Sequence, residues 1–305
     1  MPLLVTGTIG IDTVHTPTAI AEEVSGGSCA YFAAAAAFQH KPVRIVGAVG
    51  GDWPTEHAVL LESIEGLCLE GLERRSNSKT FAWGGRYFDN MNQRETLFTE
   101  LGVLDEAPPE VPDSYSDSRL IFLANSHPAV QLDLLAKFPD RQLAVADTMD
   151  LWINIARDEL LSLFKEIDGL IINDSEAEQL TEINNPISAA LAIIAMGPHF
   201  VIIKKGEHGA VLVHRDGIAV VPAFPLDVDG VIDPTGAGDS FAGGFMGYLS
   251  QTNKPDFLEA VVVGSAMASF CVEGFGLESL LKTTPSLLYR RVDAIKKLLI
   301  EKPCA

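Results

Sequence analysis

The chain has 305 residues, 47 % of them hydrophobic, which is enough to bury a large core. Its formal net charge of −19 argues against nucleic acids and anionic membranes as partners, because those surfaces bind clustered lysine and arginine. The four cysteines are scattered without the spacing of a metal site, and the N-terminus lacks the basic start of a signal peptide, so we expect a protein of the reducing cytoplasm.

Short apolar segments alternate with helical segments along most of the chain. The predicted strands are residues 3–11, 43–49, 120–124, 143–146, 169–172 and 200–203. The predicted helices are residues 29–39, 57–66, 129–137, 156–165, 176–181 and 186–196. This alternation predicts an α/β fold of three layers (αβα), in which helices cover both faces of a mainly parallel central sheet.

Polar residues come directly after four of the predicted strands, namely Asp12, Asn125, Asp147 and Asn173. In folds of this type, ligands bind beyond the carboxyl ends of the strands. We therefore expect these four side chains to line one crevice.

A predicted hairpin interrupts the alternation. Phe81, Trp83 and Tyr87 recur at alternate positions, which is the period of a strand, and after a turn at residues 89–92 the alternation resumes in residues 94–98. No predicted helix covers this hairpin, so it fits either a small β-sheet lid or an ordinary hairpin of the core. We favour the lid.

The chain shows no internal repeat that would divide it. We expect one domain over residues 1–305, with lid segments at approximately residues 13–25 and 79–107. Together with the alternating segments, this gives a three-layer αβα domain that carries a small second sheet.

The strongest chemical signal is a turn that leads into a helix at residues 233–245. Glycines let the backbone turn tightly, and apolar residues then recur on one helix face. At such a helix start the amide N–H groups of Gly236, Ala237 and Gly238 point outward, and the helix dipole adds positive potential. The pattern predicts a site for an anion.

Asp239 is unexpected at this place, because a carboxylate repels an anionic ligand. We interpret it as a general base that accepts a proton from an attacking hydroxyl group. An anion site beside a base is an arrangement for phosphoryl transfer. The alternative is an ordinary helix start, in which Asp239 only offsets the helix dipole.

The run Asp-Pro-Thr-Gly-Ala-Gly-Asp-Ser, which begins at Asp233, resembles the second signature of the ribokinase-like (PfkB) kinases of sugars and nucleosides. Gly26-Gly27, followed by Gly47-Ala48-Val49-Gly50-Gly51-Asp52, resembles the first signature of the same family. The resemblance spans nearly the whole chain. It implies an enzyme, a phosphotransferase that moves the γ-phosphate of ATP to a primary hydroxyl group, with Mg²⁺ as cofactor.

The resemblance also implies an acceptor site. Asp12 would hold hydroxyl groups of the acceptor, and Gly26 and Gly27 would let the backbone approach it. The chain departs from relatives such as ribokinase, which often carry asparagine where this chain has Tyr31. The remaining candidates for acceptor contacts are Tyr31, Phe81, Trp83 and Asn125.

On the nucleotide side, Asn173 and Glu176 match the family's Asn-x-x-Glu motif, which implies a role in placing Mg²⁺. The same pair is also a common helix cap. The candidates for contacts with ATP are Asn173, Lys205, Gly206, Gly209, Ala266 and Ala268. Lys205 equally fits a solvated lysine in a loop.

For the acceptor we favour a ribonucleoside over a free sugar, because aromatic lid residues stack on a nucleobase, although they also pack on sugars. Two rivals are a non-catalytic ligand sensor on the same fold and a Mg²⁺-dependent phosphate hydrolase. We also expect a homodimer that forms through the lid, and neither nucleic acid nor membrane as partner.

Overall fold

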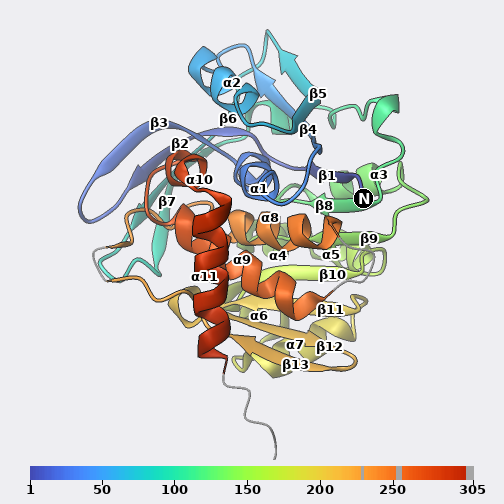
Figure 1. Ribbon diagram of the computed structural model, residues 1–305. Helices are drawn as coiled ribbons and strands as arrows, with labels where there is room; N and C mark the ends of the chain where they lie inside the picture. The colour runs from blue at the N-terminus through green and yellow to red at the C-terminus, as the bar shows by residue number, and fades with distance from the viewer. Residues whose placement is uncertain (228–229, 252–255, 300–305) are drawn as a thin grey trace, which may run out of the picture.

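A nine-stranded sheet forms the centre of the structure, a computed structural model that describes residues 1–227, 230–251 and 256–299. The strand order is β13-β12-β11-β10-β9-β8-β1-β4-β5 (Figure 1). The strands are β1 (Leu3–Thr6), β4 (Val43–Gly50), β5 (Leu67–Arg75), β8 (Leu120–Leu123), β9 (Leu143–Ala146), β10 (Gly169–Asn173), β11 (Phe200–Lys204), β12 (Ala210–His214) and β13 (Gly217–Val221). The run from β11 to β5 is parallel, whereas β12 and β13 are antiparallel.

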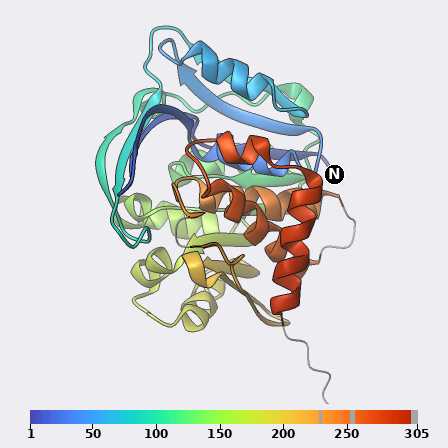
Figure 2. The ribbon, with the colours of Figure 1, turned by 60° about the vertical axis from the view of Figure 1, so that its left-hand side comes forward.

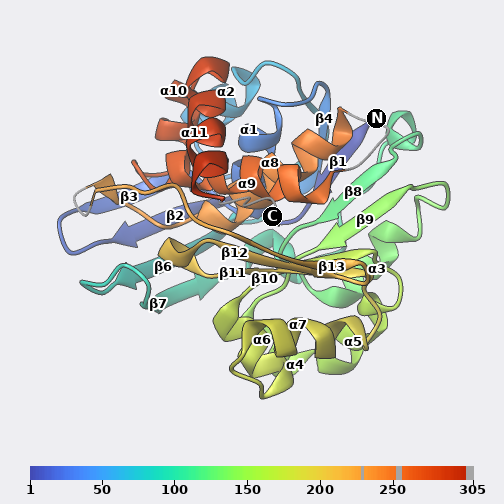
Figure 3. The same ribbon diagram turned by 60° about the horizontal axis from the view of Figure 1, so that its bottom comes forward.

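Helices cover both faces of this sheet, as the sequence predicts (Figure 3). One face carries α1 (Ser28–Ala36), α8 (Ala237–Ser250), α9 (Phe257–Cys271), α10 (Glu278–Lys282) and α11 (Pro285–Leu298). The other carries α3 (Pro128–Leu135), α4 (Asp150–Ile155), α5 (Arg157–Phe164), α6 (Asp174–Thr181) and α7 (Pro186–Ile194). Two hydrophobic clusters fill the layers between helices and sheet.

Helix α8 is the most central helix, because it packs against both α1 and α9. Small residues permit this close approach. A Cβ built on Gly247 would lie 3.1 Å from the Cα of Ala36, so a larger residue would push the two helices apart. The packing buries α8 over most of its length, and only its N-terminal turn reaches the site described below.

A second sheet of four strands, here called the lid, stands at the side of the central body (Figure 2). Its order is β3-β2-β6-β7, with β2 (Gly10–His15), β3 (Ile20–Gly26), β6 (Phe81–Tyr87) and β7 (Arg94–Glu100). The predicted hairpin is thus confirmed as β6 and β7. Asp52 of the first signature anchors its base, because its Oδ1 accepts hydrogen bonds of 2.7 and 2.8 Å from the amide and hydroxyl groups of Thr80.

The predicted first strand was wrong. Residues 3–11 divide between β1 of the central sheet and β2 of the lid, so Asp12 lies within a lid strand rather than after a central one. The sequence does not mark the break at residues 7–9, because Ile9 within it is as fully buried as Val5 before it and Val14 after it. Strand β5, the hairpin β12–β13 and helix α2 (Thr55–Glu62) complete the molecule. Of these, β5, β12 and β13 were not predicted.

Ala266 and Ala268, which we expect beside the nucleotide, lie within α9. In the part of the chain that the structure describes, every helix is too short or too polar to cross a membrane.

Candidate active site

The turn that begins α8 is held from two sides. Gly236 adopts φ +76°, a conformation that favours glycine, and a Cβ there would collide with the ring of Tyr31. Ahead of the turn, Asp233 Oδ1 accepts a hydrogen bond of 2.8 Å from the Thr235 amide. The backbone of this turn, which we call the anion turn (residues 234–238), is therefore fixed by contacts within the chain.

Two of the three predicted amide donors are free. The Ala237 N–H donates to the Pro234 carbonyl at 3.1 Å, so it is engaged inside the turn, contrary to the expectation from the sequence. Within the described residues, the amides of Gly236 and Gly238 donate no hydrogen bond. These two N–H groups, at the positive end of the helix dipole, are therefore free to donate hydrogen bonds to an anion.

Asp239 lies in the first turn of α8, immediately after the anion turn. Burial raises the pKa of its carboxyl group, while the positive charges of Lys204 and Arg94 act in the opposite direction. The net result is a carboxylate that accepts a proton more readily than an exposed aspartate does. This is the property that a general base requires.

Asp12 lies on lid strand β2 and is 4 % exposed. Its carboxylate rests against the backbone of Gly26, where a Cβ would collide with it, and the neighbouring Gly27 has φ +90°. Burial, followed by the charge of Asp233, raises the pKa of Asp12 to about 7. The hydroxyl of the buried Tyr31 lies near this carboxylate and has no hydrogen-bond partner in the described chain. The region therefore holds unsatisfied polar groups that fit hydroxyl groups of an acceptor.

Aromatic side chains lie on the same face of the lid as Asp12. In the pairing of β2 with β6, Trp83 stands opposite Asp12 and Phe81 stands opposite Gly10, which places both rings on the Asp12 face. The Arg94 guanidinium lies 5.5 Å from the centre of the Trp83 ring, within the range of a cation–π contact. A flat apolar surface therefore adjoins the carboxylate.

The lid touches both the anion turn and the loop after β11. Thr235 Oγ1 donates a hydrogen bond of 3.2 Å to the Tyr87 hydroxyl, and Asn92 Nδ2 donates one of 3.3 Å to Glu207 Oε1. These contacts join the lid to two segments that lie beyond the central strands.

Asn125 follows β8, and its amide group is engaged by the segment around α4. Its Oδ1 accepts a hydrogen bond of 2.9 Å from the Trp152 indole, and its Nδ2 lies 3.1 Å from the sulfur of Met149. The Trp152 ring in turn meets His127 edge to face at 5.1 Å. Asn125 thus joins the segments that follow β8 and β9.

Asn173 and Glu176 form a reciprocal capping box at the start of α6. Asn173 Oδ1 accepts from the Glu176 amide at 2.8 Å, and Glu176 Oε2 accepts from the Asn173 amide at 2.9 Å. Burial raises the pKa of Glu176, and the charge of Lys204 acts against that rise. The cap uses one oxygen of Glu176, which leaves Oε1 available to a ligand.

The loop after β11 contains the other candidates for nucleotide contacts. Lys205 Nζ pairs with Asp174 at 3.6 Å, Gly206 is exposed beside the lid residue Asn92, and Gly209 is buried with φ +87°. Two further candidates lie on α9, where Ala268 is partly buried. Ala266 is fully buried in the hydrophobic core, so the structure does not bring it to the surface of the site.

Two charged residues at the site, Lys204 and Arg94, were not assigned from the sequence, whereas Asp147 was expected to line the crevice. Lys204 ends β11, Arg94 begins β7, and Asp147 follows β9. Asp147 is 6 % exposed, and its Oδ1 has no hydrogen-bond partner in the described chain. The two-residue period of a strand could have identified Lys204. Phe200 and Ile202 of β11 point into the core on the α8 side, and Lys204 is the next residue on that face.

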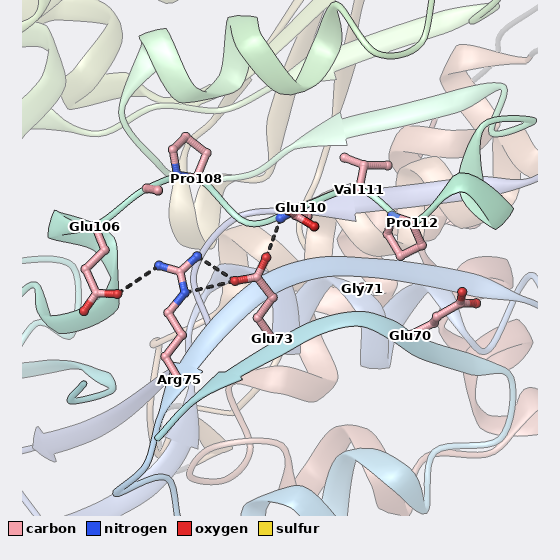
Figure 4. A pocket seen from close by; sticks show the side chains of 10 residues that line it. Glu70, Gly71, Glu73, Arg75, Glu106, Pro108, Glu110, Val111 and Pro112 are labelled. Atoms are coloured by element: carbon pink, nitrogen blue, oxygen red, sulfur yellow. Dashed lines mark hydrogen bonds and ion pairs between the residues drawn. The ribbon is translucent and has the colours of Figure 1, made fainter. Parts of the chain in front are cut away.

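A hollow of about 550 Å³ lies away from these residues, between β5 and the linker at residues 106–112. Its arginine, Arg75, is held by Glu73 at 2.7 Å and by Glu106 at 3.3 Å, as Figure 4 shows. Because Arg75 is already paired with two carboxylates, this hollow does not compete with the anion turn as the active site.

The fold and the site define a phosphotransferase with an alcohol group as acceptor, and comparisons with known proteins agree. The family model described as pfkB family carbohydrate kinase matches residues 136–284. Over 257 residues the chain is 29 % identical to cytidine kinase of Thermococcus kodakarensis, which covers 82 % of this chain and 89 % of that protein. These matches confirm the resemblance to the ribokinase-like PfkB family of kinases.

Two solved structures show the same fold. The nucleoside kinase of Burkholderia thailandensis in complex with inosine has a TM-score of 0.79 at 19 % identity, covering 99 % of this chain and 100 % of that one. The ribokinase of Cryptococcus neoformans in complex with ADP has a TM-score of 0.77 at 21 % identity, covering 98 % and 99 %.

The position of Asp239 leads to a first prediction. The Asp239→Asn substitution preserves shape but removes the proton acceptor, so turnover is expected to fall by about 10²–10⁴-fold while ATP affinity and thermal stability stay close to wild type. Steady-state kinetics with the best acceptor, together with calorimetric titration of ATP, measure both effects. A variant that turns over at nearly the wild-type rate would show that Asp239 is not the base.

Proposed function

We propose that this protein is a ribonucleoside kinase, which transfers the γ-phosphoryl group of ATP to the primary hydroxyl of a nucleoside. The observation that carries the proposal is the placement of Trp83 opposite Asp12 in the lid. Asp12 is suited to ribose hydroxyl groups, and the adjoining aromatic surface is suited to a base. The relative named as a cytidine kinase supports the same acceptor class.

In the proposed reaction, Asp239 takes the proton of the acceptor hydroxyl. The acceptor oxygen forms a bond to the γ-phosphorus while the bond from phosphorus to the bridging oxygen breaks, and its electron pair leaves with ADP. The Gly236 and Gly238 amides donate hydrogen bonds to the transferring group. Tyr31, packed against Gly236, keeps those amides in place. Asp12, Gly26 and Gly27 hold the acceptor.

The residues present fit a magnesium ion that is held largely by substrate. Glu176 Oε1 and the unpartnered Asp147 Oδ1 are available oxygens, and Mg²⁺ commonly uses only one or two carboxylates together with phosphate and water. The ion would neutralise charge on the phosphates when bound. In the described residues no group of three or more His, Cys, Asp or Glu side chains converges on one point, which disfavours a metal-dependent phosphate hydrolase.

For the nucleotide, we propose that the loop with Lys205, Gly206 and Gly209 contacts ATP, and that Ala268 lies beside the adenine. Asn173 contributes by orienting Glu176 through the capping box. Cys29, Cys68 and Cys271 are free thiols, which supports work in the reducing cytoplasm, where ATP is present.

A free-sugar kinase is the second candidate function. One observation favours it, namely that Asp12, Gly26 and Gly27 are suited to hydroxyl groups alone and do not require a base. The ring of Trp83 also fits the apolar face of a sugar. Kinetics of lid variants with both classes of acceptor separate the two functions.

The second prediction therefore concerns Phe81 and Trp83. If they stack on a nucleobase, substituting the responsible ring by alanine is expected to cost ~1–3 kcal/mol in kcat/KM for a nucleoside. The loss for free ribose, which has no base, is expected to be small. The matched control is Phe98→Ala. Phe98 lies against Gly84, which pairs with Thr13, so its ring lies on the face of the lid that points away from Asp12. Equal losses for nucleoside and ribose would favour the sugar kinase.

We also propose that the lid mediates a homodimer. Its edge strand β7 is exposed along its whole length, and Ile20 and Leu97 on the two edge strands are 60 % and 38 % exposed. Open edges with apolar side chains are sites of strand pairing between chains. Sedimentation velocity is expected to show a dimer for wild type and a monomer for Ile20→Asp combined with Leu97→Asp. A wild-type monomer at micromolar concentration contradicts the proposal.

A further inference from the structure

Lys204 lies where the central sheet meets the anion turn. It is the last residue of β11, it is partly buried, and it stands opposite Asn173 in the pairing of β10 with β11. A Cβ built on Gly238 would lie 2.5 Å from Lys204 Nζ. Glycine at this position therefore makes room for the ammonium group beside the free amide of Gly238.

This arrangement is unfavourable until an anion binds. The first turn of a helix carries partial positive charge, which repels an ammonium group. In the described part of the chain, no carboxylate oxygen lies within 4.0 Å of Lys204 Nζ, and the ammonium donates no hydrogen bond to another residue. A partly buried ammonium group that makes neither an ion pair nor a hydrogen bond is stabilised by a bound anion.

The charge of Lys204 affects the pKa values of three nearby carboxyl groups, although Lys204 forms no ion pair with them. Burial raises the pKa of Asp147, Glu176 and Asp239, and the charge of Lys204 acts against that rise in each case. The ammonium thus lies among three acidic groups and beside the base, at a place where the anion turn binds phosphate.

We propose that the Lys204 ammonium binds a non-bridging oxygen of the γ-phosphoryl group and that it is a catalytic residue of the transfer. The inference rests on the proposed kinase function. During transfer the acceptor oxygen bonds to phosphorus as the bond to the ADP oxygen breaks, and negative charge stays on the non-bridging oxygens. A cation fixed beside the Gly238 amide meets that charge without reorganisation.

The neighbouring lysine is arranged differently. Lys205 Nζ pairs with Asp174 at 3.6 Å, so its charge already has a partner at the start of α6. Lys204 has none in the described chain, although the two residues are adjacent. Comparing variants of the two lysines therefore shows which of them contacts the γ-phosphate.

The test compares Lys204→Met with Lys205→Met and with Lys137→Met, a control at an exposed lysine after α3. For Lys204→Met, kcat at saturating ATP and acceptor is expected to fall by about 10²–10³-fold, the usual loss for one transition-state donor. Calorimetric titration is expected to show a larger loss of affinity for ATP than for ADP, because ADP has no γ-phosphoryl group. Lys137→Met is expected to match wild type.

Two results overturn the proposal. One is a Lys204→Met variant whose kcat stays within a few-fold of the control. The other is that Lys205→Met, and not Lys204→Met, loses more affinity for ATP than for ADP. If wild type phosphorylates neither nucleosides nor sugars, the proposed function fails separately, and the ATP and ADP titrations still decide the role of Lys204.

A wild-type experiment covers the case in which Lys204→Met does not fold. A crystal structure with ADP, aluminium fluoride and acceptor is expected to place Nζ within hydrogen-bond distance of a fluoride. An ammonium bound to Asp147 or Asp239 in that complex contradicts the proposal.

Discussion

The site depends on the way in which the N-terminal turn of α8 is fixed. A left-handed glycine at position 236 is backed by the ring of Tyr31, and the carboxylate of Asp233 holds the Thr235 amide ahead of it. Because α8 is packed between α1 and α9, this turn cannot move without the core. The free amides of Gly236 and Gly238 are therefore oriented before a ligand arrives, which is the condition for electrostatic stabilisation of a transition state.

A second constraint is the charge of the site without ligands. Asp12, Asp147, Glu176 and Asp239 are all shifted by burial towards the protonated form, and the charge of Lys204 reaches only the last three. Burial of so many carboxyl groups costs stability, which proteins accept mainly at functional sites. Cationic groups and the positive end of a helix dipole offset this charge, and they also bind phosphate.

The lid connects the two halves of the reaction. Its strands carry Asp12 and Trp83 on the acceptor side, while its tip reaches the loop after β11 through Asn92 and Glu207. Closure of a lid excludes water, which otherwise competes with the acceptor hydroxyl. In the proposed reaction the same sheet would hold the acceptor and cover the nucleotide loop.

Alternation of apolar and helical segments was sufficient to predict the layers and most strands, because buried parallel strands are short, apolar and separated by helices. The end of the first strand was not predictable, since Thr6, Gly7 and Thr8 at the change from one sheet to the other are buried or partly buried like the strands on either side. Of the two lysines at the end of β11, Lys205 was singled out from the sequence, whereas Lys204 is the one that lies beside Gly238 of α8.

Arg94 was missed for a related reason. Its place opposite Tyr87 depends on the register of the hairpin, and a bulge between Gly84 and Gly85 changes that register along the strand. In contrast, the anion turn and Asp239 are adjacent in sequence, so their arrangement follows from a single local motif. Contacts between distant segments, such as Lys204 with Gly238, needed the folded structure.

The central claim is that phosphate passes from ATP to the primary hydroxyl of a nucleoside. The most direct measurement follows labelled γ-phosphate from ATP in parallel reactions with ribonucleosides, ribose and hexoses. The account predicts label in a nucleoside 5′-monophosphate, with kcat/KM for the best nucleoside above that for any free sugar. Label that appears in a sugar phosphate in preference, or only in inorganic phosphate, would contradict it.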